Sequence, residues 1–329
     1  MNRVPSTPLN VFAMSHLKAA AMINLTASHN PGGYGGLEIF DGLTGGLANN
    51  PVTDPIVASL RKDPAADQDA IRIVRIADAD HALIAHIDPP IHAYADYLRD
   101  VIGVDPEIIR RSGVRAAVDV QFGAGVVLQE VLEALGIPEG EVNDPGAQVV
   151  FLNNQLDPDF GGRRNVEVTP ENLDGLAQVV RELGLDLGLA VDGDGDRAGA
   201  RSPLPGADGT MSDTRFFSGN DLATTIAYGA LKQAKEYMEA SGQTWDPSRY
   251  VIVRSVVSTA WIDAVARAFG VPEDNIRKTA VGFRFLNDAI RQAKAEDKIV
   301  ILAFEENGGI SLGNAIAYKD GFASDLKLL

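Results

Sequence analysis

Three aspartates stand at alternate positions in Asp192-Gly193-Asp194-Gly195-Asp196-Arg197. The intervening glycines let the backbone fold so that the three carboxylates converge, and converging carboxylates repel one another unless a cation neutralises them. Oxygen ligands suit Mg²⁺, which leaves positions for water or a phosphate oxygen. An EF-hand is excluded, because its sixth position would be Arg197 instead of Gly and its twelfth Pro203 instead of Glu. The alternative is a solvated acidic turn, but the apolar run just before the motif favours a metal site.

A serine and a histidine are adjacent in Thr26-Ala27-Ser28-His29-Asn30-Pro31, directly after a short apolar run. A serine at the end of a strand projects into the crevice above a sheet, where open α/β folds bind ligands. His29 could polarise the Ser28 hydroxyl or orient a phosphate on it. The alternative is a simple turn closed by Pro31, and the spacing alone favours that turn.

Two further segments place polar groups beside predicted elements. Phe304-Glu305-Glu306-Asn307-Gly308-Gly309 follows an apolar run, and a carboxylate with a carboxamide suits the paired hydroxyls of a sugar. A turn or helix-cap cluster explains the same residues equally well. Val281-Gly282-Phe283-Arg284 puts a cation near a helix start, and by itself this pattern fits a surface arginine.

Composition excludes several classes of protein. The chain has 329 residues, a formal net charge of −16 and no cysteine. Without cysteine there is no disulfide scaffold, cysteine-ligated zinc, iron–sulfur cluster or cysteine nucleophile. The acid excess argues against a nucleic-acid surface, and no apolar run reaches the length of a membrane span. We therefore expect a cytoplasmic protein of two or three domains that binds neither nucleic acid nor membrane.

Alternating strands and helices must position these segments. The pattern predicts a helix starting at Thr7-Pro8, and Ser218 to Asp221 form a capping box for another. A buried strand is predicted at 22–25 and further strands at 114–121, 149–153, 187–191, 250–254 and 299–304. Helices are predicted at 90–103, 169–184, 218–239, 259–269 and 282–295. Residues 26–36 and 41–55 are expected to be loops, and 203–213 is the best linker candidate. Strands that alternate with helices imply a parallel sheet covered by helices. A dinucleotide site is disfavoured, because Leu128 occupies the third glycine position of the pattern that starts at Gly123.

Taken in order, four strings resemble the motifs of the α-D-phosphohexomutase family: TASHNP at 26–31, DGDGDR at 192–197, VGFR at 281–284 and EENGG at 305–309. The family includes phosphoglucomutases, phosphomannomutases, phosphoglucosamine mutases and phosphopentomutases, and the resemblance runs from about residue 6 to 329. It implies an α/β fold of consecutive three-layer α/β domains, with mixed, mostly parallel sheets covered by helices. The implied domains are a partial phosphoserine-loop domain (1–110), a metal-loop domain (111–207) and a sugar-recognition domain (208–329), while the family's fourth, phosphate-binding domain is absent.

The resemblance also implies roles for individual residues. Ser28 would carry a phosphoryl group, assisted by His29. One Mg²⁺ ion would be held by Asp192, Asp194, Asp196 and an oxygen on Ser28. Arg197, Gly282, Arg284, Glu305 and Asn307 would bind a small-molecule phosphosugar, and a sugar bisphosphate would serve as intermediate and activator. The implied activity is a phosphosugar mutase that moves a phosphoryl group between C1 and C6 of glucose or mannose phosphate.

Two departures from the family pattern leave an alternative open. Glu38 stands, by spacing, where the family has a lysine close to the reacting phosphate, and a carboxylate there would repel phosphate. The opening strands and the last domain of the family are also missing. The alternative is a truncated or weakly active relative that binds Mg²⁺ and a phosphosugar without efficient turnover. A phosphopentomutase or a phosphoglucosamine mutase is a further alternative, and the oligomeric state is not indicated.

Overall fold

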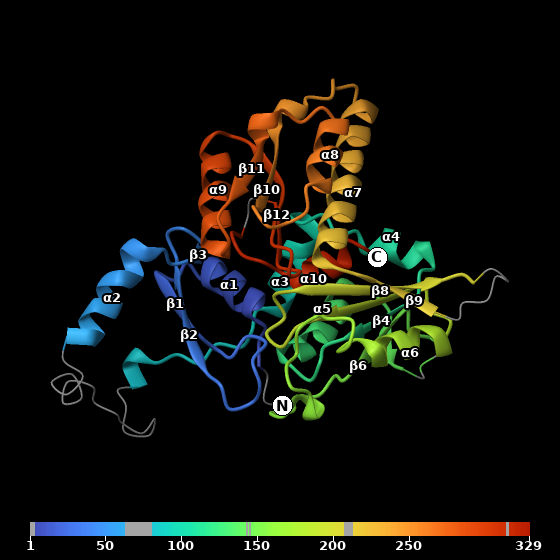
Figure 1. Cartoon of the computed structure of the whole chain (residues 1–329). Coiled ribbons are helices and arrows are strands. Elements are labelled where there is room, and N and C mark those ends of the chain that lie inside the picture. The colour runs from blue at the N-terminus through green and yellow to red at the C-terminus, as the bar shows by residue number, and fades with distance from the viewer. Residues whose placement is uncertain (1–3, 63–80, 143, 145, 207–212, 314–315) are drawn as a thin grey trace.

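Three separate sheets follow one another along the described part of the chain (Figure 1). The computed structural model describes residues 4–62, 81–142, 144, 146–206, 213–313 and 316–329. The second and third sheets are mixed and mostly parallel, with helices on both faces, as the fold class predicts. Short 3₁₀ turns occur at η2 (His81–Leu83), η3 (Ala124–Val127), η4 (Phe160–Gly162), η5 (Pro247–Arg249) and η6 (Glu273–Asn275).

The first sheet is small and antiparallel. It has the order β1-β2-β3, and its elements are α1 (Thr7–His16), β1 (Ala21–Thr26), β2 (Gly36–Asp41), β3 (Gly46–Leu47) and α2 (Asn50–Lys62). The helix from Thr7 is confirmed, and α1 packs on β1. The prediction of a buried strand at 22–25 is wrong about burial, since within β1 Asn24 alone is buried. The expected loop at 41–55 is also wrong in part, because β3 and the start of α2 lie within it.

The second sheet has the order β5-β6-β4-β7-β8-β9. Its strands are β4 (Ala116–Asp119), β5 (Glu139–Glu141), β6 (Val149–Leu152), β7 (Leu187–Val191), β8 (Ala198–Leu204) and β9 (Asp213–Phe217). Alternate residues of the central strands face two apolar clusters, one under α6 (Asp174–Glu182) and the other under α3 (Ile91–Asp100) and α5 (Leu128–Leu135). The short helix α4 (Pro106–Ser112) precedes β4.

The stretch 203–213 is not a link between domains. Strand β8 runs to Leu204, β9 begins at Asp213, and the two pair antiparallel in one sheet. The linker prediction is therefore wrong: its Gly- and Pro-rich composition belongs to a connection between neighbouring strands. The second sheet extends to Phe217, past the boundary expected at residue 207. Of this stretch, residues 207–212 lie outside the described part.

The third sheet has the order β11-β10-β12-β13 and carries helices on both faces (Figure 1). Its elements are α7 (Gly219–Ala240), β10 (Tyr250–Ser255), α8 (Trp261–Ala268), β11 (Ile276–Thr279), α9 (Phe283–Ala295), β12 (Ile299–Phe304) and β13 (Ile310–Leu312). The predicted capping box is present, since the Ser218 and Asp221 side chains each bond the other's backbone N–H. Helix α10 (Gly321–Leu326) follows and packs on β7, β8 and β13.

One unit occurs in all three sheets: a strand, a loop, and a second strand that pairs antiparallel with the first. The pairs are β1–β2, β7–β8 and β12–β13. Their loops contain the serine motif, the aspartate motif and the Glu305–Asn307 segment. Within the described residues, every helix is too short or too polar to cross a lipid bilayer.

Candidate active site

The three aspartates of the β7–β8 loop converge and are buried. One carboxylate oxygen of each lies within 4.8 Å of the others. Each carboxylate uses one oxygen for protein donors: Asp192 Oδ1 accepts from the backbone N–H groups of Asp196 and Arg197, Asp194 Oδ2 from the hydroxyls of Thr7 and Thr26, and Asp196 Oδ2 from the Tyr318 hydroxyl. The other three oxygens are buried, and no described residue donates a hydrogen bond to them: Asp192 Oδ2, Asp194 Oδ1 and Asp196 Oδ1.

Such a cluster is costly without a cation. Burial, reinforced by Asp196, raises the pKa of Asp192 to about 7, and burial with both neighbours raises the pKa of Asp194. Arg197 offsets part of the charge, with Nε 3.6 Å from Asp192 Oδ2 and 3.9 Å from Asp196 Oδ1. Three buried carboxylates, each with one oxygen close to an oxygen of the other two and each with one oxygen that no described group hydrogen-bonds, are a suitable donor set for a small divalent cation. The residues present therefore fit Mg²⁺.

The serine loop lies directly against the aspartate loop. The Thr26 hydroxyl donates to Asp194 Oδ2 at 3.2 Å and accepts from the Ser28 backbone N–H at 2.7 Å. A Cβ on Gly193 would lie 3.0 Å from the carbonyl oxygen of Ser28, so a side chain at residue 193 would crowd this approach. Ser28 itself has φ +52°, a left-handed conformation that is uncommon for a non-glycine residue.

His29 is oriented from both sides. Its Nδ1 lies 3.1 Å from Ser28 Oγ, and its Nε2 lies 3.1 Å from Glu167 Oε1. Burial and the nearby Arg197 lower the pKa of His29, which favours the neutral imidazole at pH 7. In that form Nε2–H can donate to Glu167 while Nδ1 accepts the Ser28 proton. Glu167 also contacts Arg197 Nη1 at 3.3 Å and so joins the two loops.

The β12–β13 loop packs on the same centre. The Ala198 N–H donates to the Gly308 carbonyl, and a backbone bridge joins Arg197 to Gly309. Glu305 is buried, and burial raises its pKa; one of its oxygens accepts the Gly282 N–H at 2.9 Å. Asn307 is exposed, and its carboxamide oxygen accepts the Gly309 N–H.

Gly282 and Arg284 occupy the rim of this arrangement. Gly282 has φ +119°, so a side chain there would strain the turn that brings its N–H to Glu305. Arg284 is exposed; its Nη1 donates to Asn50 Oδ1 at the start of α2, and its guanidinium lies over the Phe285 ring. The structure thus links all four predicted segments, with Arg284 at the outer edge.

Glu38 faces the aspartate cluster from β2. Burial and the charge of Asp196 raise its pKa, and Asn24 donates a hydrogen bond to it at 3.4 Å. A cation is nonetheless present in this region: buried Lys319 has Nζ 3.0 Å from Asp196 Oδ2. Burial would lower the pKa of Lys319, but Asp196 and its neighbours outweigh that effect and raise it, so the ammonium keeps its charge.

Sequence reasoning missed Lys319, Glu167, Thr7 and Tyr318. Lys319 and Tyr318 come from the segment after β13, and Glu167 precedes α6, so no local spacing connects any of them to Ser28. Thr7 was expected only to begin a helix, although its hydroxyl also donates to Asp194. The local signal that could have pointed to the last of these segments is Tyr318-Lys319-Asp320, in which a cation stands between a phenol and a carboxylate.

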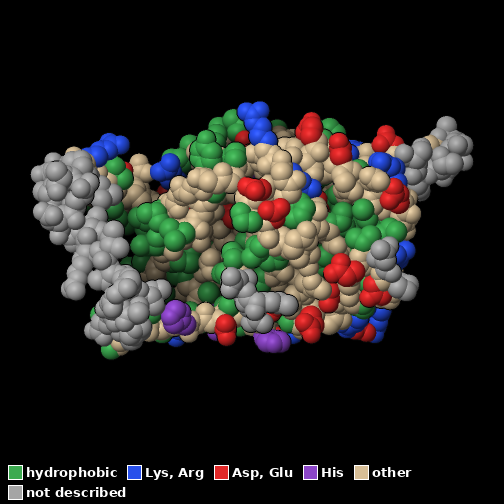
Figure 2. Space-filling view, turned by 90° about the horizontal axis from the view of Figure 1, so that it is seen from below, with side chains coloured by type: hydrophobic (Ala, Val, Ile, Leu, Met, Phe, Trp, Pro, Cys, Tyr) green, Lys and Arg blue, Asp and Glu red, His purple; other side chains and the backbone are tan. Residues whose placement is uncertain are grey.

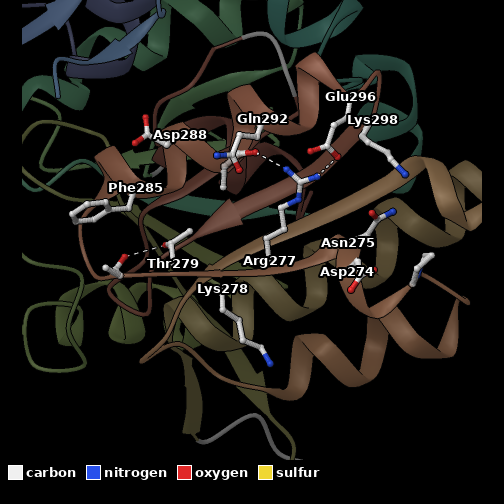
Figure 3. Close-up of a pocket in the computed structure, with 13 residues that line it drawn as sticks. Asp274, Asn275, Arg277, Lys278, Thr279, Phe285, Asp288, Gln292, Glu296 and Lys298 are labelled. Carbon is white, nitrogen blue, oxygen red and sulfur yellow. Dashed lines mark hydrogen bonds and ion pairs between the residues drawn. The ribbon is translucent and has the colours of Figure 1, made fainter. Parts of the chain in front are cut away.

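A groove of about 870 Å³ lies elsewhere, between β11 and α9 (Figure 3). Its Arg277 donates to the Ala289 carbonyl and pairs with Glu296, and its Lys278 pairs with Asp263. These cations are therefore satisfied within the protein. A second groove, of about 540 Å³, runs along β1 to Ser28 and Asp194 and has a mainly apolar lining.

Profiles of the phosphoglucomutase/phosphomannomutase family match the chain as α/β/α domain I at residues 2–67, domain II at 92–202 and domain III at 227–329. The phosphoglucosamine mutase of Arthrobacter sp. (strain FB24) is 28% identical over 98% of this chain and 59% of its own length.

Solved structures share the fold. A Thermus thermophilus protein assigned as a phosphomannomutase superposes with a TM-score of 0.72 and 26% identity, covering 98% of this chain and 62% of that one. An Aspergillus fumigatus N-acetylphosphoglucosamine mutase, solved with GlcNAc-6P and magnesium, has a TM-score of 0.55 and 15% identity, over 98% of this chain and 74% of that one. The chain spans about 60% of the length of the Arthrobacter and Thermus relatives. It belongs to the phosphoglucomutase/phosphomannomutase family.

Proposed function

We propose that this chain carries the catalytic centre of a phosphosugar mutase, in which Ser28 exchanges a phosphoryl group with a hexose phosphate. The observation that carries the proposal is the set of three buried aspartates beside the Ser28 loop, each with one carboxylate oxygen that has no hydrogen-bond partner among the described residues. Structural carboxylates are normally satisfied when buried, so this set is explained best by a ligand. Glucose or mannose phosphate is the proposed substrate, with transfer between C1 and C6.

The proposed metal ligands are Asp192, Asp194, Asp196 and an oxygen on phosphorylated Ser28. A bound Mg²⁺ would withdraw charge from the phosphoryl group and so favour attack by a hydroxyl. The magnesium of the Aspergillus relative supports this assignment. Because the protein as a whole is strongly acidic, the attraction for phosphate must be local, and Arg197 and Lys319 supply it.

His29 is proposed to hold the proton that Ser28 exchanges. When a sugar hydroxyl attacks phosphorus, it releases its proton to solvent, the bond from phosphorus to Ser28 Oγ breaks, and Oγ takes a proton from Nδ1 of the protonated imidazole, which becomes neutral. In the return step Oγ attacks the other phosphate of the sugar bisphosphate and gives its proton to Nδ1, while the sugar oxygen that leaves phosphorus takes a proton from solvent. Glu167 fixes the ring by accepting from Nε2–H, the arrangement by which an acid orients a catalytic imidazole.

Glu305 and Asn307 are proposed to bind sugar hydroxyls, with Gly282 positioning Glu305 and Arg284 reaching the phosphate at the rim. Both sugar orientations must present hydroxyls to the same residues, because the bisphosphate returns its second phosphate to the same serine. The names of several relatives indicate phosphoglucosamine as an alternative substrate, and a pentose phosphate is another.

A second candidate is binding without efficient turnover, and Glu38 favours it. Its carboxyl faces the aspartate cluster, where added negative charge opposes phosphate binding. Glu38→Lys separates the two candidates: if Glu38 limits turnover, the substitution raises kcat, whereas an already competent mutase loses activity from the altered charge balance.

The decisive assay is isomerisation of glucose 1-phosphate, mannose 1-phosphate, glucosamine phosphate and ribose phosphate, with Mg²⁺ and added sugar bisphosphate. Ser28→Ala should abolish both turnover and phosphorylation of the protein by the bisphosphate. Ser241→Ala, at the end of α7, is the matched control. Turnover that survives Ser28→Ala would refute the nucleophile, and Mg²⁺-dependent sugar binding with no turnover would establish the second candidate.

A further inference from the structure

The backbone carbonyls on either side of Asp192 are both held by the turn that follows strand β4. The side-chain amide of Gln121 donates through Nε2 to the Val191 carbonyl at 2.9 Å. The Ala124 N–H donates to the Gly193 carbonyl at 2.8 Å. Because Val191 and Gly193 flank Asp192, this turn fixes the backbone of the aspartate from both sides.

The β4 turn (residues 119–124) has an unusual backbone. Gln121 has φ +50° and Phe122 has φ +60°, two successive left-handed conformations that are uncommon for residues other than glycine. Gly123 then comes so close to the aspartate loop that a Cβ on it would lie 2.3 Å from the Gly193 carbonyl oxygen. Strained backbone of this kind persists where surrounding contacts impose it, and it is concentrated at functional sites. Here it accompanies the contact between the turn and the aspartate loop.

The carboxamide of Gln121 has one orientation that satisfies its neighbours. The residue is fully buried. Its Oε1 accepts from Arg163 Nη1 at 3.1 Å, while its Nε2 donates to the carbonyls of Val166 and Val191 at 3.2 and 2.9 Å. The reverse orientation would set Oε1 against two carbonyl oxygens and the amide nitrogen against a guanidinium, so that acceptors would face acceptors and donors would face donors. Arg163 therefore directs both donors of Gln121 toward the two carbonyls.

Asp119 holds this arrangement in place. It is fully buried, and its Oδ1 accepts from the Gln121 N–H and from Asn153 Nδ2, both at 2.8 Å. Its Oδ2 lies 3.3 Å from Arg163 Nη2, and the Arg163 guanidinium lies over the Phe122 ring. A buried charge that is paired and hydrogen-bonded in this way gives a rigid support.

The same glutamine side chain also reaches the segment that orients His29. The Val166 carbonyl accepts from Gln121, while the Val166 N–H donates to the His29 carbonyl at 3.3 Å. The next residue, Glu167, contacts His29 Nε2 at 3.1 Å. One carboxamide therefore ties the end of the strand before Asp192 to the segment that contains Glu167.

We infer that Gln121 is a positioning residue, which sets the backbone at Asp192 and at Glu167 and thereby governs the affinity of the aspartate loop for Mg²⁺. The inference rests on the proposed function, because it assigns a support to the metal site proposed there. Residues that support metal ligands through hydrogen bonds typically account for about 10- to 100-fold of the metal affinity.

Gln121→Met tests the inference, because methionine has a similar length and removes both donors. Gln148→Met is the matched control: Gln148 Nε2 also donates to two backbone carbonyls, those of Ile109 and Val114, at 2.6 and 3.0 Å. Gln148 directly precedes β6, which is parallel to β4, so it lies at the opposite end of the sheet from Gln121. Isothermal titration calorimetry with MgCl₂ should give a Kd at least about tenfold higher for Gln121→Met and an unchanged Kd for Gln148→Met.

Acidic side chains elsewhere on the molecule set the baseline for this titration. The net charge is −16, and Figure 2 shows Asp and Glu side chains scattered over one face. Binding of Mg²⁺ to such groups is measured with Asp192→Asn and subtracted. If the unsubstituted protein binds no Mg²⁺ above this baseline, the proposed metal site is refuted and the inference with it. If Gln121→Met binds Mg²⁺ as tightly as the unsubstituted protein, or if Gln148→Met weakens binding equally, the inference alone is overturned.

Amide hydrogen exchange of the metal-free protein supplies a readout that does not depend on Mg²⁺. The N–H groups of Asp196 and Arg197 donate to Asp192 Oδ1, so displacement of Asp192 in Gln121→Met should speed their exchange about tenfold or more. Gln148→Met should leave it unchanged, and unchanged exchange in Gln121→Met would also overturn the inference. Circular dichroism verifies that each variant folds. Gln121→Glu, which has the same shape and keeps an acceptor for Arg163 without the two donors, should show the same losses.

Discussion

Asp192→Asn should stabilise the metal-free protein at pH 8 and abolish its stabilisation by Mg²⁺. Burial raises the pKa of Asp192 from 3.8 to about 7. When the pKa of a carboxyl is higher in the folded protein than in the unfolded chain, the folded protein loses stability as the pH rises from the unfolded-state pKa to the folded-state pKa. At 1.36 kcal/mol for each tenfold change in proton affinity, the full cost is roughly 4 kcal/mol, reached at about pH 7.

The net gain should be smaller than this cost. Asparagine keeps an oxygen for the N–H groups of Asp196 and Arg197 but loses the charge 3.6 Å from Arg197 Nε. We therefore expect a gain of about 2 kcal/mol at pH 8 and less than half of that at pH 5. For 329 residues at about 2.1 cal/mol/K each, unfolding entropy is near 0.7 kcal/mol/K, so the melting temperature should rise by about 3 °C.

Mg²⁺ should stabilise the unsubstituted protein and leave the stability of the Asp192→Asn variant unchanged. At a hundred times its Kd, a ligand stabilises the folded state by about 2.7 kcal/mol, which is about 4 °C on the same scale. Differential scanning calorimetry in EDTA and in MgCl₂ measures both effects, with exposed Asp297→Asn as the control. The reasoning is refuted if the variant keeps the Mg²⁺ shift, or if it is less stable than the unsubstituted protein in EDTA at pH 8.

Three further substitutions follow from the same geometry. Asp325→Leu should stabilise the protein by about 1–3 kcal/mol, because both Asp325 oxygens are buried and neither has a hydrogen-bond partner among the described residues. Since burial raises the pKa of Asp325, the gain in free energy measured by urea unfolding should be larger at pH 8 than at pH 5, and equal gains would contradict this origin. Lys319→Met should lower kcat about 100-fold or more while the fold measured by circular dichroism is kept; unchanged kcat would remove Lys319 from the site. Glu167→Gln removes the charge that favours protonated His29, so the acidic limb of the pH–rate profile should move to lower pH, and an unmoved limb would show that His29 does not control it.

Local patterns predicted the elements that their own residues determine. The runs at 187–191 and 299–304 match β7 and β12 to the residue, and the capping box at Ser218 begins α7 as expected. Burial was predictable only where neighbouring strands supplied it. The apolar run at 22–25 does form a strand, but nothing in the run itself indicates that Ile23 and Leu25 stay exposed.

The sequence motifs predicted the residues of the site that lie close together in the chain, but not the residues that reach it from distant segments. Asp192, Asp194 and Asp196 are close in sequence, so their convergence follows from the loop. Lys319 and Glu167 reach the same centre from distant segments through tertiary packing, which sequence spacing does not encode. Position 38 illustrates what the sequence alone does not reveal. The sequence shows that Glu38 stands where the family has a lysine, but only the structure shows that the ammonium of Lys319 lies near the same carboxylates.

The division of each aspartate's oxygens has a consequence for metal selectivity. One oxygen of each aspartate already accepts hydrogen bonds from the protein: Asp194 from Thr7 and Thr26, Asp192 from two backbone N–H groups, and Asp196 from Tyr318. Each aspartate of the loop therefore offers one oxygen to a metal, which disfavours bidentate coordination. Ca²⁺ takes six to eight oxygens and often takes both oxygens of a carboxylate, whereas Mg²⁺ needs few protein ligands and completes its octahedron with water or phosphate. If the loop binds a divalent cation as proposed, the small number of free carboxylate oxygens would favour Mg²⁺ over Ca²⁺ and would leave coordination positions for water or a phosphate oxygen.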